Sequence, residues 1–461
     1  MTKEQIREII DNQRSFFRND KTRSVDSRLE YLRKFKSSLV RYEGEMIDAV
    51  KHDMGRADVE TFFMELNMNM DELDYALRNI RSWTKHQKVR TPFLFFKSSS
   101  AIYPEPYGTA LIISAWNFPF LQLFSPLVGA IAAGNTAVLK PSSDSPSCAS
   151  VANKIIRETF PPEYVIVLEG ETEITTMLLE ELFDYIFFTG SPRVGKFIME
   201  AAAKHLTPVT LELGGKSPVI IDGDAHIDLA AKRVVWGKYY NAGQICVSPD
   251  HVYVHKRIKQ QFIDAAKKYI KQFYGENPKT GPDYGFIIND RNFHRITEYL
   301  KEGTVIYGGQ TEERTRYIAP TIIDNLPDDA KMRKDEIFAP ILPVIEFTDI
   351  NDVIKSLKNQ QKPLSLYYFS EDPLKQKRII AETSSGGVTI NDTMAHGGTV
   401  YLPFGGVGNS GMGAYHGKKT FDTFTHYKSV MNHSTIYDSP LKYAPYKGKL
   451  KMLKTLIKFL P

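Results

Sequence analysis

Cysteine is scarce in this chain, with two residues, Cys148 and Cys246, among 461. Two widely separated cysteines give neither a disulfide framework nor the paired spacing of a zinc site. We therefore expect no bound metal and a reducing, cytoplasmic environment. Long hydrophobic runs are also absent: no stretch reaches the roughly 18 apolar residues of a membrane-spanning helix. The first residues lack the apolar core of a signal peptide, so the sequence predicts a soluble protein.

No charge of one sign dominates the composition. Lysine and arginine number 59 and the acidic residues 54, so the formal net charge is +5. That excess is small for this length and does not indicate a nucleic-acid-binding protein. The chain exceeds the roughly 250–300 residues at which one hydrophobic core stops growing, which predicts two or more domains. Hydrophobic residues make up 42%, as in an ordinary folded protein.

The pattern of apolar residues indicates an α/β protein. Residues 3–83 show helical spacing, whereas 110–114 and 136–140 are short, continuous apolar runs separated by a helical stretch around 127–134. Continuous apolar strands are typical of a parallel sheet covered on both faces, and ligands bind beyond the strand ends of such sheets. A second alternation of strands and helices begins after residue 212.

Cys246 is the candidate nucleophile. It follows a glycine-containing bend, Tyr240-Asn241-Ala242-Gly243-Gln244-Ile245. A thiolate is strongly nucleophilic once a dipole or a cation lowers the pKa of the thiol. An isolated cysteine is more often a small buried apolar residue, so the bend alone leaves both interpretations open.

Glu212 is the candidate base, because it stands between two leucines and ahead of two glycines in Leu211-Glu212-Leu213-Gly214-Gly215. Apolar surroundings disfavour a carboxylate and raise its pKa toward the range useful for proton abstraction. A glutamate at a strand end that faces water is the alternative.

Three further short motifs carry candidate site residues. They are Ala115-Trp116-Asn117-Phe118-Pro119, Phe188-Thr189-Gly190-Ser191 with Gly195 beyond it, and Glu336-Ile337-Phe338-Ala339-Pro340. Asn117 taken alone is better explained as a turn residue before a proline. The second motif leads into a helix, whose first amides favour a phosphate. It lacks the Gly-x-Gly-x-x-Gly pattern, so an ordinary strand-to-helix turn fits as well.

Taken together and in this order, these motifs resemble the NAD(P)-dependent aldehyde dehydrogenase superfamily, from about residue 15 to about 427. The short N-terminus and basic tail are most similar to the class 3 branch, which includes fatty and aromatic aldehyde dehydrogenases. The resemblance implies a Rossmann-type cofactor domain (1–84 and 105–211) and an α/β catalytic domain (212–424). A small oligomerisation ribbon (85–104 and 425–445) completes the fold and implies a homodimer.

The resemblance also implies roles for individual residues. Cys246 forms a thiohemiacetal and then a thioester, Glu212 activates the hydrolytic water, and Asn117 donates to the oxyanion. Cofactor contacts are implied for Ser114, Trp116, Lys140, Ser143, Gly190, Ser191, Gly195, Gly214, Glu336 and Phe338. Medium to long aliphatic or aromatic aldehydes are the expected substrates, with a lining drawn from Tyr239, Tyr240, Tyr401 and Phe404. Ala339 replaces a glycine of the family motif, a small change that we expect to be tolerated.

The cofactor prediction comes from a departure from the family pattern. Many members carry a glutamate three residues after the lysine of the Lys-Pro-Ser segment, where it bonds the adenine-ribose hydroxyls and repels a 2′-phosphate. Ser143 holds that position here. Without the acid, Lys140 and the serine hydroxyls can accept a phosphate, so NADP should serve at least comparably to NAD. Asp144 turning inward, which would restore a preference for NAD, is the alternative.

Other functions remain as alternatives: a CoA-acylating enzyme, in which a thiol replaces water, a plain thiol hydrolase, and a noncatalytic binding protein of this fold. Retention of both Glu212 and Cys246 favours hydrolytic aldehyde oxidation. Residues 402–413 are rich in glycine and other turn formers, which predicts a loop at the substrate entrance. Residues 446–461 form a basic amphipathic pattern that suits either an anionic membrane surface or a partner subunit.

Overall fold

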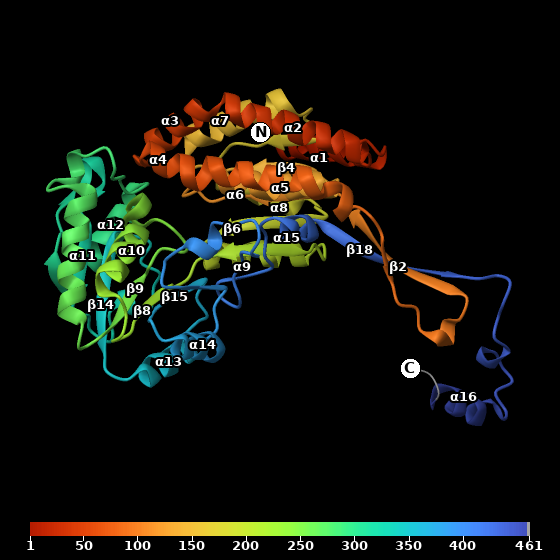
Figure 1. Ribbon diagram of the computed structural model, residues 1–461. Helices are drawn as coiled ribbons and strands as arrows, with labels where there is room; N and C mark the ends of the chain where they lie inside the picture. Colours follow the sequence, from red (N-terminus) through yellow and green to blue (C-terminus); the bar gives the residue numbers. More distant parts are fainter. Residues whose placement is uncertain (459–461) are drawn as a thin grey trace.

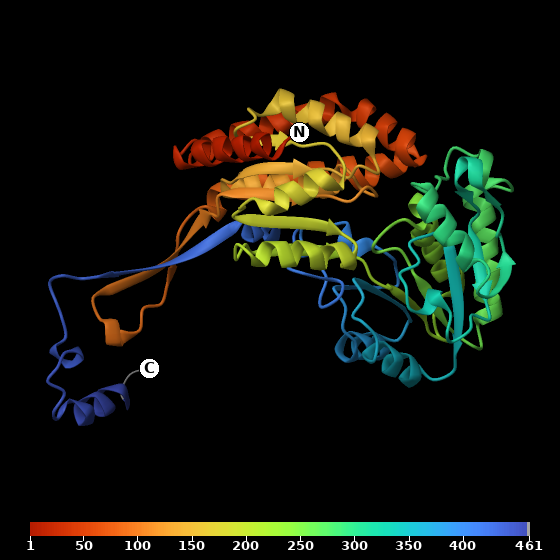
Figure 2. The same ribbon diagram turned by 180° about the vertical axis from the view of Figure 1, so that it is seen from behind.

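The computed structural model describes residues 1–458. Three β-sheets organise them, one of six strands, one of seven and one of three, beside a two-stranded ribbon, β11 (Thr311–Glu312) with β12 (Tyr317–Ile318). Figures 1 and 2 show the two large sheets with their helices as a body, from which the three-stranded sheet projects as an arm. The predicted α/β fold class is confirmed.

The six-stranded sheet has the order β17-β7-β6-β3-β4-β5. Its strands are β3 (Thr109–Ile113), β4 (Thr136–Lys140), β5 (Val165–Val167), β6 (Tyr185–Gly190), β7 (Val209–Leu213) and β17 (Gly411–Met412). All neighbours are parallel except β17, which runs antiparallel to β7. The carboxyl ends of the parallel strands therefore meet at one edge, where a ligand is expected.

Both faces of this sheet are covered, as the apolar strands predicted. Ala110 and Ile112 of β3 pack with α2, α3, α5, α6 and α7, whereas Leu111 and Ile113 pack with α1, α8 and α9. This division follows from the alternation of side chains along a strand. The helices are α1 (Lys3–Arg18), α2 (Val25–Arg41), α3 (Glu43–Met54), α5 (Met68–Trp83), α6 (Leu121–Ala133), α7 (Pro146–Thr159), α8 (Thr172–Glu180) and α9 (Pro192–Ala203).

The seven-stranded sheet has the order β10-β13-β14-β9-β8-β15-β16 and is parallel except for β10 against β13. Its strands are β8 (Pro218–Ile221), β9 (His251–His255), β10 (Thr304–Tyr307), β13 (Thr321–Asp324), β14 (Ile341–Phe347), β15 (Ser365–Phe369) and β16 (Gly387–Ile390). One face packs against α10 (Ile227–Tyr239), α11 (Lys259–Tyr274) and α12 (Asp290–Tyr299). The other packs against α13 (Ile350–Lys358) and α14 (Pro373–Glu382).

The arm consists of β1 (Gln87–Val89), β2 (Ser98–Pro106) and β18 (Thr425–His433). β2 and β18 pair without interruption from Thr425 opposite Pro106 to His433 opposite Ser98. The chain beyond β18 leads to α16 (Lys449–Lys458), which Figure 1 shows beside the far end of the arm. Of the predicted tail helix (446–461), residues 449–458 are helical, residues 446–448 lie before the helix, and residues 459–461 lie outside the described part of the chain.

The glycine-rich segment 402–413 departs from its prediction as a pure loop. Gly411 and Met412 form β17 and pair with Glu212 and Leu211 of β7. A side chain at Gly411 would clash with the carbonyl oxygen of Leu211, so glycine permits this close pairing. The segment then leads to α15 (Lys418–Thr423), which packs against α6.

Two features are absent from residues 1–458. In this part of the chain, no helix combines the length and the hydrophobicity needed to cross a membrane. Nor does it bring three histidine, cysteine or acidic side chains together in a way that could hold a metal ion.

Candidate active site

The segment that carries Cys246 begins with a left-handed turn after α10. The φ angle is +48° at Asn241, +50° at Ala242 and +74° at Gly243. Positive φ costs a residue with a Cβ roughly 1–2 kcal/mol, so surrounding contacts must hold the turn. Glycine is required at 243, because an added Cβ would clash with the carbonyl of Ala339. The turn thereby brings the start of the Cys246 loop against the segment that follows Glu336.

Cys246 is half-buried and is not part of a disulfide. Burial, with further contributions from Glu336 and Glu212, raises the pKa of its thiol to about 12, whereas the backbone N–H groups of Cys246 and Val247 oppose this rise. Both carboxyl groups therefore lie close enough to the sulfur to act on it electrostatically. Without a bound ligand the thiol is protonated at neutral pH.

Glu212 lies in β7, between Thr189 of β6 and Gly411 of β17. Its side chain is buried, and neither carboxyl oxygen has a hydrogen-bond partner among the described residues. Burial raises the pKa of this carboxyl well above its ordinary value. A buried acid without a partner destabilises the fold, and such groups cluster at functional sites.

Asn117 is held so that one amide N–H remains available. Its Oδ1 accepts a hydrogen bond from Gln122 at 3.0 Å, and its Nδ2 donates to the carbonyl of Gln244 at 3.1 Å. Gln244 precedes Cys246 by two residues, so this bond joins the amide directly to the cysteine loop. The second Nδ2 hydrogen is free to donate to a ligand.

The start of α9 offers a site for an anion at the carboxyl end of β6. Ser191 caps the helix, with its hydroxyl accepting from the N–H of Val194 at 3.4 Å. A Cβ at Gly195 would clash with Leu213, so this glycine lets the helix pack closely on the sheet. Free amides and the helix dipole favour a phosphate here.

Two predicted cofactor contacts come together where the sheets meet. The rings of Trp116 and Phe338 meet edge to face, with centroids 5.6 Å apart. The carboxyl group of Glu336 lies against Gly214, where an added Cβ would displace it. Burial, followed by the charge of Asp250, raises the pKa of Glu336 to about 8.

The predicted ribose contacts lie after β3 and β4. Lys140 is buried, and its Nζ donates to the carbonyls of Pro141 and Gly170, both at 2.7 Å. Burial lowers the pKa of this lysine to about 8. Ser143 is exposed, whereas the Asp144 carboxylate accepts from Asn289 at 2.9 Å. The buried hydroxyl of Ser114, after β3, has no partner among the described residues.

The predicted substrate aromatics do not form a common lining. Tyr239 lies in the core of the seven-stranded unit and donates to the carbonyl of Thr321 at 2.9 Å, which corrects its expected role. Tyr240 is also buried, and its hydroxyl donates to the carbonyl of Glu60 at 2.6 Å. Consecutive residues of a helix end point in different directions, and both of these point into packed interior.

Tyr401 and Phe404 remain in the glycine-rich segment. Tyr401 is 72% exposed, whereas Phe404 is stacked between the imidazoles of His396 and His416. Burial lowers the pKa of each of these two imidazoles to about 4, so both are neutral near pH 7. The resulting stack is uncharged and aromatic. Sequence reasoning missed both histidines, as well as Gln122 and the N-terminal acids described below, because no local motif marks them.

Comparisons with known proteins identify the family. The model of the "Aldehyde dehydrogenase family" matches residues 1–430. The chain belongs to the aldehyde dehydrogenase family. As an aldehyde dehydrogenase it is an NAD(P)-dependent enzyme that oxidises aldehydes, which confirms the predicted family and enzyme class.

Three relatives are similar over nearly their whole length. The 4,4′-diaponeurosporen-aldehyde dehydrogenase of Staphylococcus aureus is 44% identical, over 96% of this chain and 97% of that protein. Aldehyde dehydrogenase family 3 member A2 of Pongo abelii is 41% identical, over 96% and 93%. The "dimeric NADP-preferring" aldehyde dehydrogenase of Canis lupus familiaris is 40% identical, over 96% and 99%. The predicted likeness to class 3 is confirmed.

A solved structure described as the substrate-bound state of Staphylococcus aureus AldH is similar in fold. Its TM-score is 0.96, with 44% identity, and the match covers 98% of this chain and 99% of that one. The aldehyde dehydrogenase fold therefore extends through the two large sheets and the arm.

Proposed function

We propose that this aldehyde dehydrogenase oxidises its substrate to a carboxylate through a covalent thioester on Cys246. The observation that carries the proposal is the arrangement around the sulfur. Asn117 keeps an amide N–H free beside the cysteine loop, and Glu212 is buried without a partner and close enough to influence the thiol. These groups match a nucleophile, an oxyanion donor and a base.

In the first step the Cys246 thiol loses its proton to solvent, the sulfur forms a C–S bond to the aldehyde carbon, and the π electron pair moves to oxygen. The Asn117 amide and the backbone N–H of Cys246 donate to this oxygen, an effect of roughly 3 kcal/mol per donor. A bound NAD(P)+ would accept the hydride that leaves the same carbon, while the electron pair on oxygen re-forms the C=O bond and leaves a thioester on Cys246. A water molecule then gives a proton to Glu212 and attacks the thioester, the C–S bond breaks, and the carboxylate is released.

The chain offers groups that fit such a cofactor. The buried hydroxyls of Ser114 and Thr189, after β3 and in β6, have no partner among the described residues. The N-terminus of α9 lies at the same sheet edge, and Trp116 and Phe338 face each other nearby. We propose that the six-stranded unit (1–84 and 105–211) binds the cofactor and that residues 212–424 carry the catalytic loop.

Use of both NAD and NADP is supported by the loop after β4. Ser143 places no negative charge there, and the Asp144 carboxylate is engaged by Asn289. Lys140 uses two of its three N–H groups on carbonyls, which leaves one for a phosphate. One relative, from Canis lupus familiaris, is named as NADP-preferring.

For the substrate we propose medium to long aliphatic or aromatic aldehydes. The stack of His396, Phe404 and His416 supports this class, because its two imidazoles are neutral near pH 7 and carry no charge that would attract a charged semialdehyde. Activity toward hexanal, decanal and benzaldehyde should exceed that toward succinic semialdehyde. The opposite order would contradict the proposal.

We also propose that the arm mediates a homodimer and that α16 makes peripheral contact with anionic membrane. Lys451, Lys454 and Lys458 share one side of α16, and Leu450 and Ile457 lie on another. Sedimentation with phosphatidylglycerol vesicles, but not with phosphatidylcholine vesicles, is expected for the full chain and not after truncation at residue 445. Equal sedimentation of both proteins would exclude the membrane contact.

The covalent mechanism is tested by Cys246→Ala. Aldehyde-dependent formation of reduced cofactor should disappear, whereas binding of NAD+ is retained because the cofactor groups lie elsewhere. Cys148→Ala is the matched control, since Cys148 is buried in the core around α7 and should be nearly silent. Turnover by Cys246→Ala would exclude the proposal, and a requirement for CoA would indicate transfer to a thiol instead of water.

A further inference from the structure

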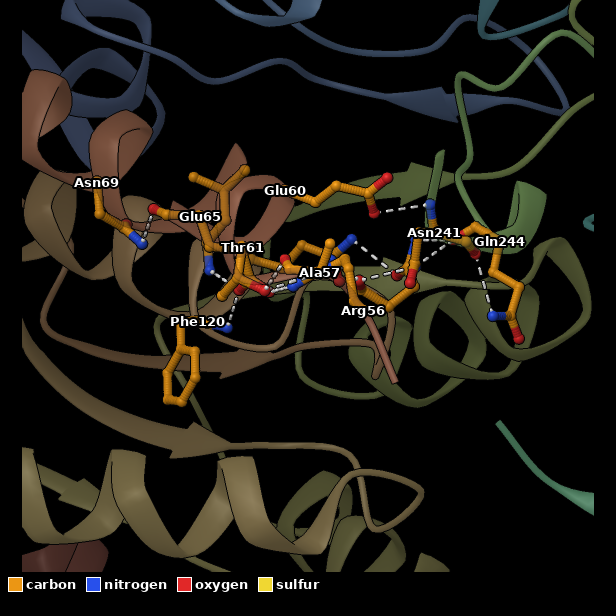
Figure 3. A network of polar contacts seen from close by, with 12 residues as sticks. Arg56, Ala57, Glu60, Thr61, Glu65, Asn69, Phe120, Asn241 and Gln244 are labelled. Atoms are coloured by element: carbon orange, nitrogen blue, oxygen red, sulfur yellow. Dashed lines mark hydrogen bonds and ion pairs between the residues drawn. The ribbon is translucent and has the colours of Figure 1, made fainter. Parts of the chain in front are cut away.

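A stretch of the N-terminal helical region reaches the active site. Residues 56–65 follow Gly55, which ends α3 with φ +65°, and include α4 (Asp58–Thr61) and the start of the π-helix η1 (Phe62–Asn67). Figure 3 shows three charged side chains of this stretch, Arg56, Glu60 and Glu65, in a network of polar contacts that extends to the cysteine loop. The chemistry proposed above uses none of the three.

Arg56 and Glu65 hold both ends of the segment that carries Asn117. Arg56 is fully buried, donates to the backbone carbonyl of Asn117 at 2.9 Å, and forms an ion pair with Glu65. The other oxygen of Glu65 accepts the N–H groups of Phe120 and Leu121 at 2.7 and 3.1 Å. These amides belong to the first turn of α6, where no intrahelical acceptor exists.

Glu60 holds the left-handed turn itself. Its carboxylate accepts the backbone N–H of Asn241 at 3.1 Å, and its backbone carbonyl accepts the Tyr240 hydroxyl at 2.6 Å. Asn241 is the first residue of the turn with positive φ. Because that conformation is strained, a bond from outside the turn is needed to maintain it.

The left-handed turn is linked to the side-chain amide of Asn117 through Gln244. The carbonyl of Gln244 accepts from Nδ2 of Asn241 at 3.3 Å and from Nδ2 of Asn117 at 3.1 Å. Gln244 also binds the segment just before α12, because its Oε1 accepts the N–H of Ile288 at 3.0 Å. A displacement of Asn241 therefore moves the carbonyl that orients Asn117.

We infer that Glu60 is a positioning residue for this reaction: by holding the backbone of Asn241, it fixes the turn before Cys246 and, through Gln244, the amide of Asn117. This inference rests on the proposed roles of Cys246 and Asn117. Glu60 acts through the turn, so its loss should slow the chemistry without removing cofactor binding. A misplacement of about 1 Å in such a site slows a reaction by roughly a hundredfold.

Glu60 is also the member of the network that can be changed most safely. Removing Arg56 or Glu65 would leave a fully buried charge without its partner and would threaten the fold. Glu60→Ala removes the acceptor, Glu60→Gln keeps an acceptor oxygen at the same reach, and Glu60→Asp withdraws it by one methylene. Asp58→Ala is the matched control, because Asp58 is an exposed acid of the same short helix and pairs with Lys51.

The experiment is a stopped-flow burst of reduced cofactor with hexanal and NAD+, beside the Kd of NAD+ and the thermal midpoint. The burst amplitude measures the fraction of active sites that can react, and the burst rate depends on how well the reacting groups are positioned. Glu60→Ala should keep the amplitude and the Kd while the burst rate falls about tenfold to a hundredfold. Glu60→Asp should fall between Ala and wild type, and both Glu60→Gln and Asp58→Ala should stay within about threefold of wild type.

Three results would overturn the inference. The first is an unchanged burst rate in Glu60→Ala. The second is a lower amplitude and a lower thermal midpoint in Glu60→Ala with an unchanged burst rate. The third is a Glu60→Gln protein whose burst is as slow as that of Glu60→Ala. The Cys246→Ala protein separates this failure from failure of the proposed function. A burst in Cys246→Ala excludes the covalent mechanism, whereas its absence together with a wild-type rate in Glu60→Ala excludes the role of Glu60 alone.

Discussion

At the scale of single residues, the surroundings of Cys246 keep its thiol protonated until a ligand arrives. Burial accounts for most of the rise of its pKa to about 12, and two nearby acids add to it. A protonated thiol is a weak nucleophile and resists alkylation and oxidation. The protein alone therefore protects its cysteine, and the positive charge of an arriving cofactor would favour the reactive thiolate.

The first prediction concerns this pH dependence. The thiol pKa is raised, so the thiolate fraction grows about tenfold per pH unit until the pH approaches about 12. Alkylation of the cofactor-free protein by iodoacetamide should rise accordingly between about pH 7 and pH 10. Mass spectrometry should place the label on Cys246 and leave Cys148, which is buried, unmodified. A rate that levels off near pH 8 would contradict the raised pKa.

The second prediction concerns Glu212. In Glu212→Gln the burst of reduced cofactor should persist, because hydride leaves before the base is needed, whereas steady-state turnover should fall roughly a hundredfold to ten-thousandfold. Rapid-quench analysis should find the acyl group on Cys246. Glu181→Gln serves as the control, because Glu181 forms an ion pair with the exposed Arg7. Loss of the burst together with turnover would mean that Glu212 also activates the thiol.

The third prediction concerns the cofactor. Ser143→Glu should lower kcat/KM for NADP+ by roughly tenfold or more and leave NAD+ little changed, because the new carboxylate repels a 2′-phosphate. Ser143→Gln, of similar size without charge, should behave like wild type. A native enzyme that already rejects NADP+ by about a hundredfold, or roughly 2.7 kcal/mol, would refute our interpretation of Ser143.

At the scale of elements, the left-handed turn depends on one glycine. Gly243→Ala brings a Cβ into the carbonyl of Ala339, so the turn must move and the Cys246 loop with it. We expect a loss of roughly 1–3 kcal/mol of stability and a large loss of activity. Gly408→Ala is matched, because its φ is +66° but nothing lies within 4 Å of the added atom. Equal effects of both changes in activity assays and thermal unfolding would show that φ alone, not the contact, matters.

Elements were predictable where local pattern decides their structure. The apolar runs 110–114 and 136–140 match β3 and β4 to within a residue, because a strand buried on both faces has few alternatives. β17 was not predicted, because two residues, one of them a glycine, are too few to show a strand pattern. They form a strand because β7 lies alongside.

The candidate site was predictable to the extent that motifs mark it. Short motifs single out Cys246, Glu212 and Asn117, whereas the interior position of Tyr239 depends on how α10 is rotated against its sheet. The contact of Glu60 with Asn241 joins residues 181 positions apart, so only the assembled tertiary structure reveals it.

At the scale of the whole molecule, the arm exposes apolar side chains that a single chain does not cover. Phe93 and Phe96 are 56% and 49% exposed near its tip. Changing both to serine should shift the sedimentation coefficient from that of a dimer to that of one 52.4 kDa chain. Leu206→Ser, which alters a 91% exposed residue of the body, should leave the dimer intact. A wild-type protein that sediments as a monomer would exclude the proposed assembly.

Because β17 pairs with β7, this edge of the six-stranded sheet is completed late in biosynthesis. Glu212 leaves the ribosome about two hundred residues before its edge neighbour Gly411, and the N–H of Leu213 has to wait for the carbonyl of Ser410. Until then a ribosome-bound chain that already contains the proposed catalytic residues Asn117, Glu212 and Cys246 leaves this edge of β7 without its partner strand, and an unpaired edge can pair with another chain. A chain that stalls before residue 412 thus lacks the partner strand of β7 and also β18, the partner strand of β2.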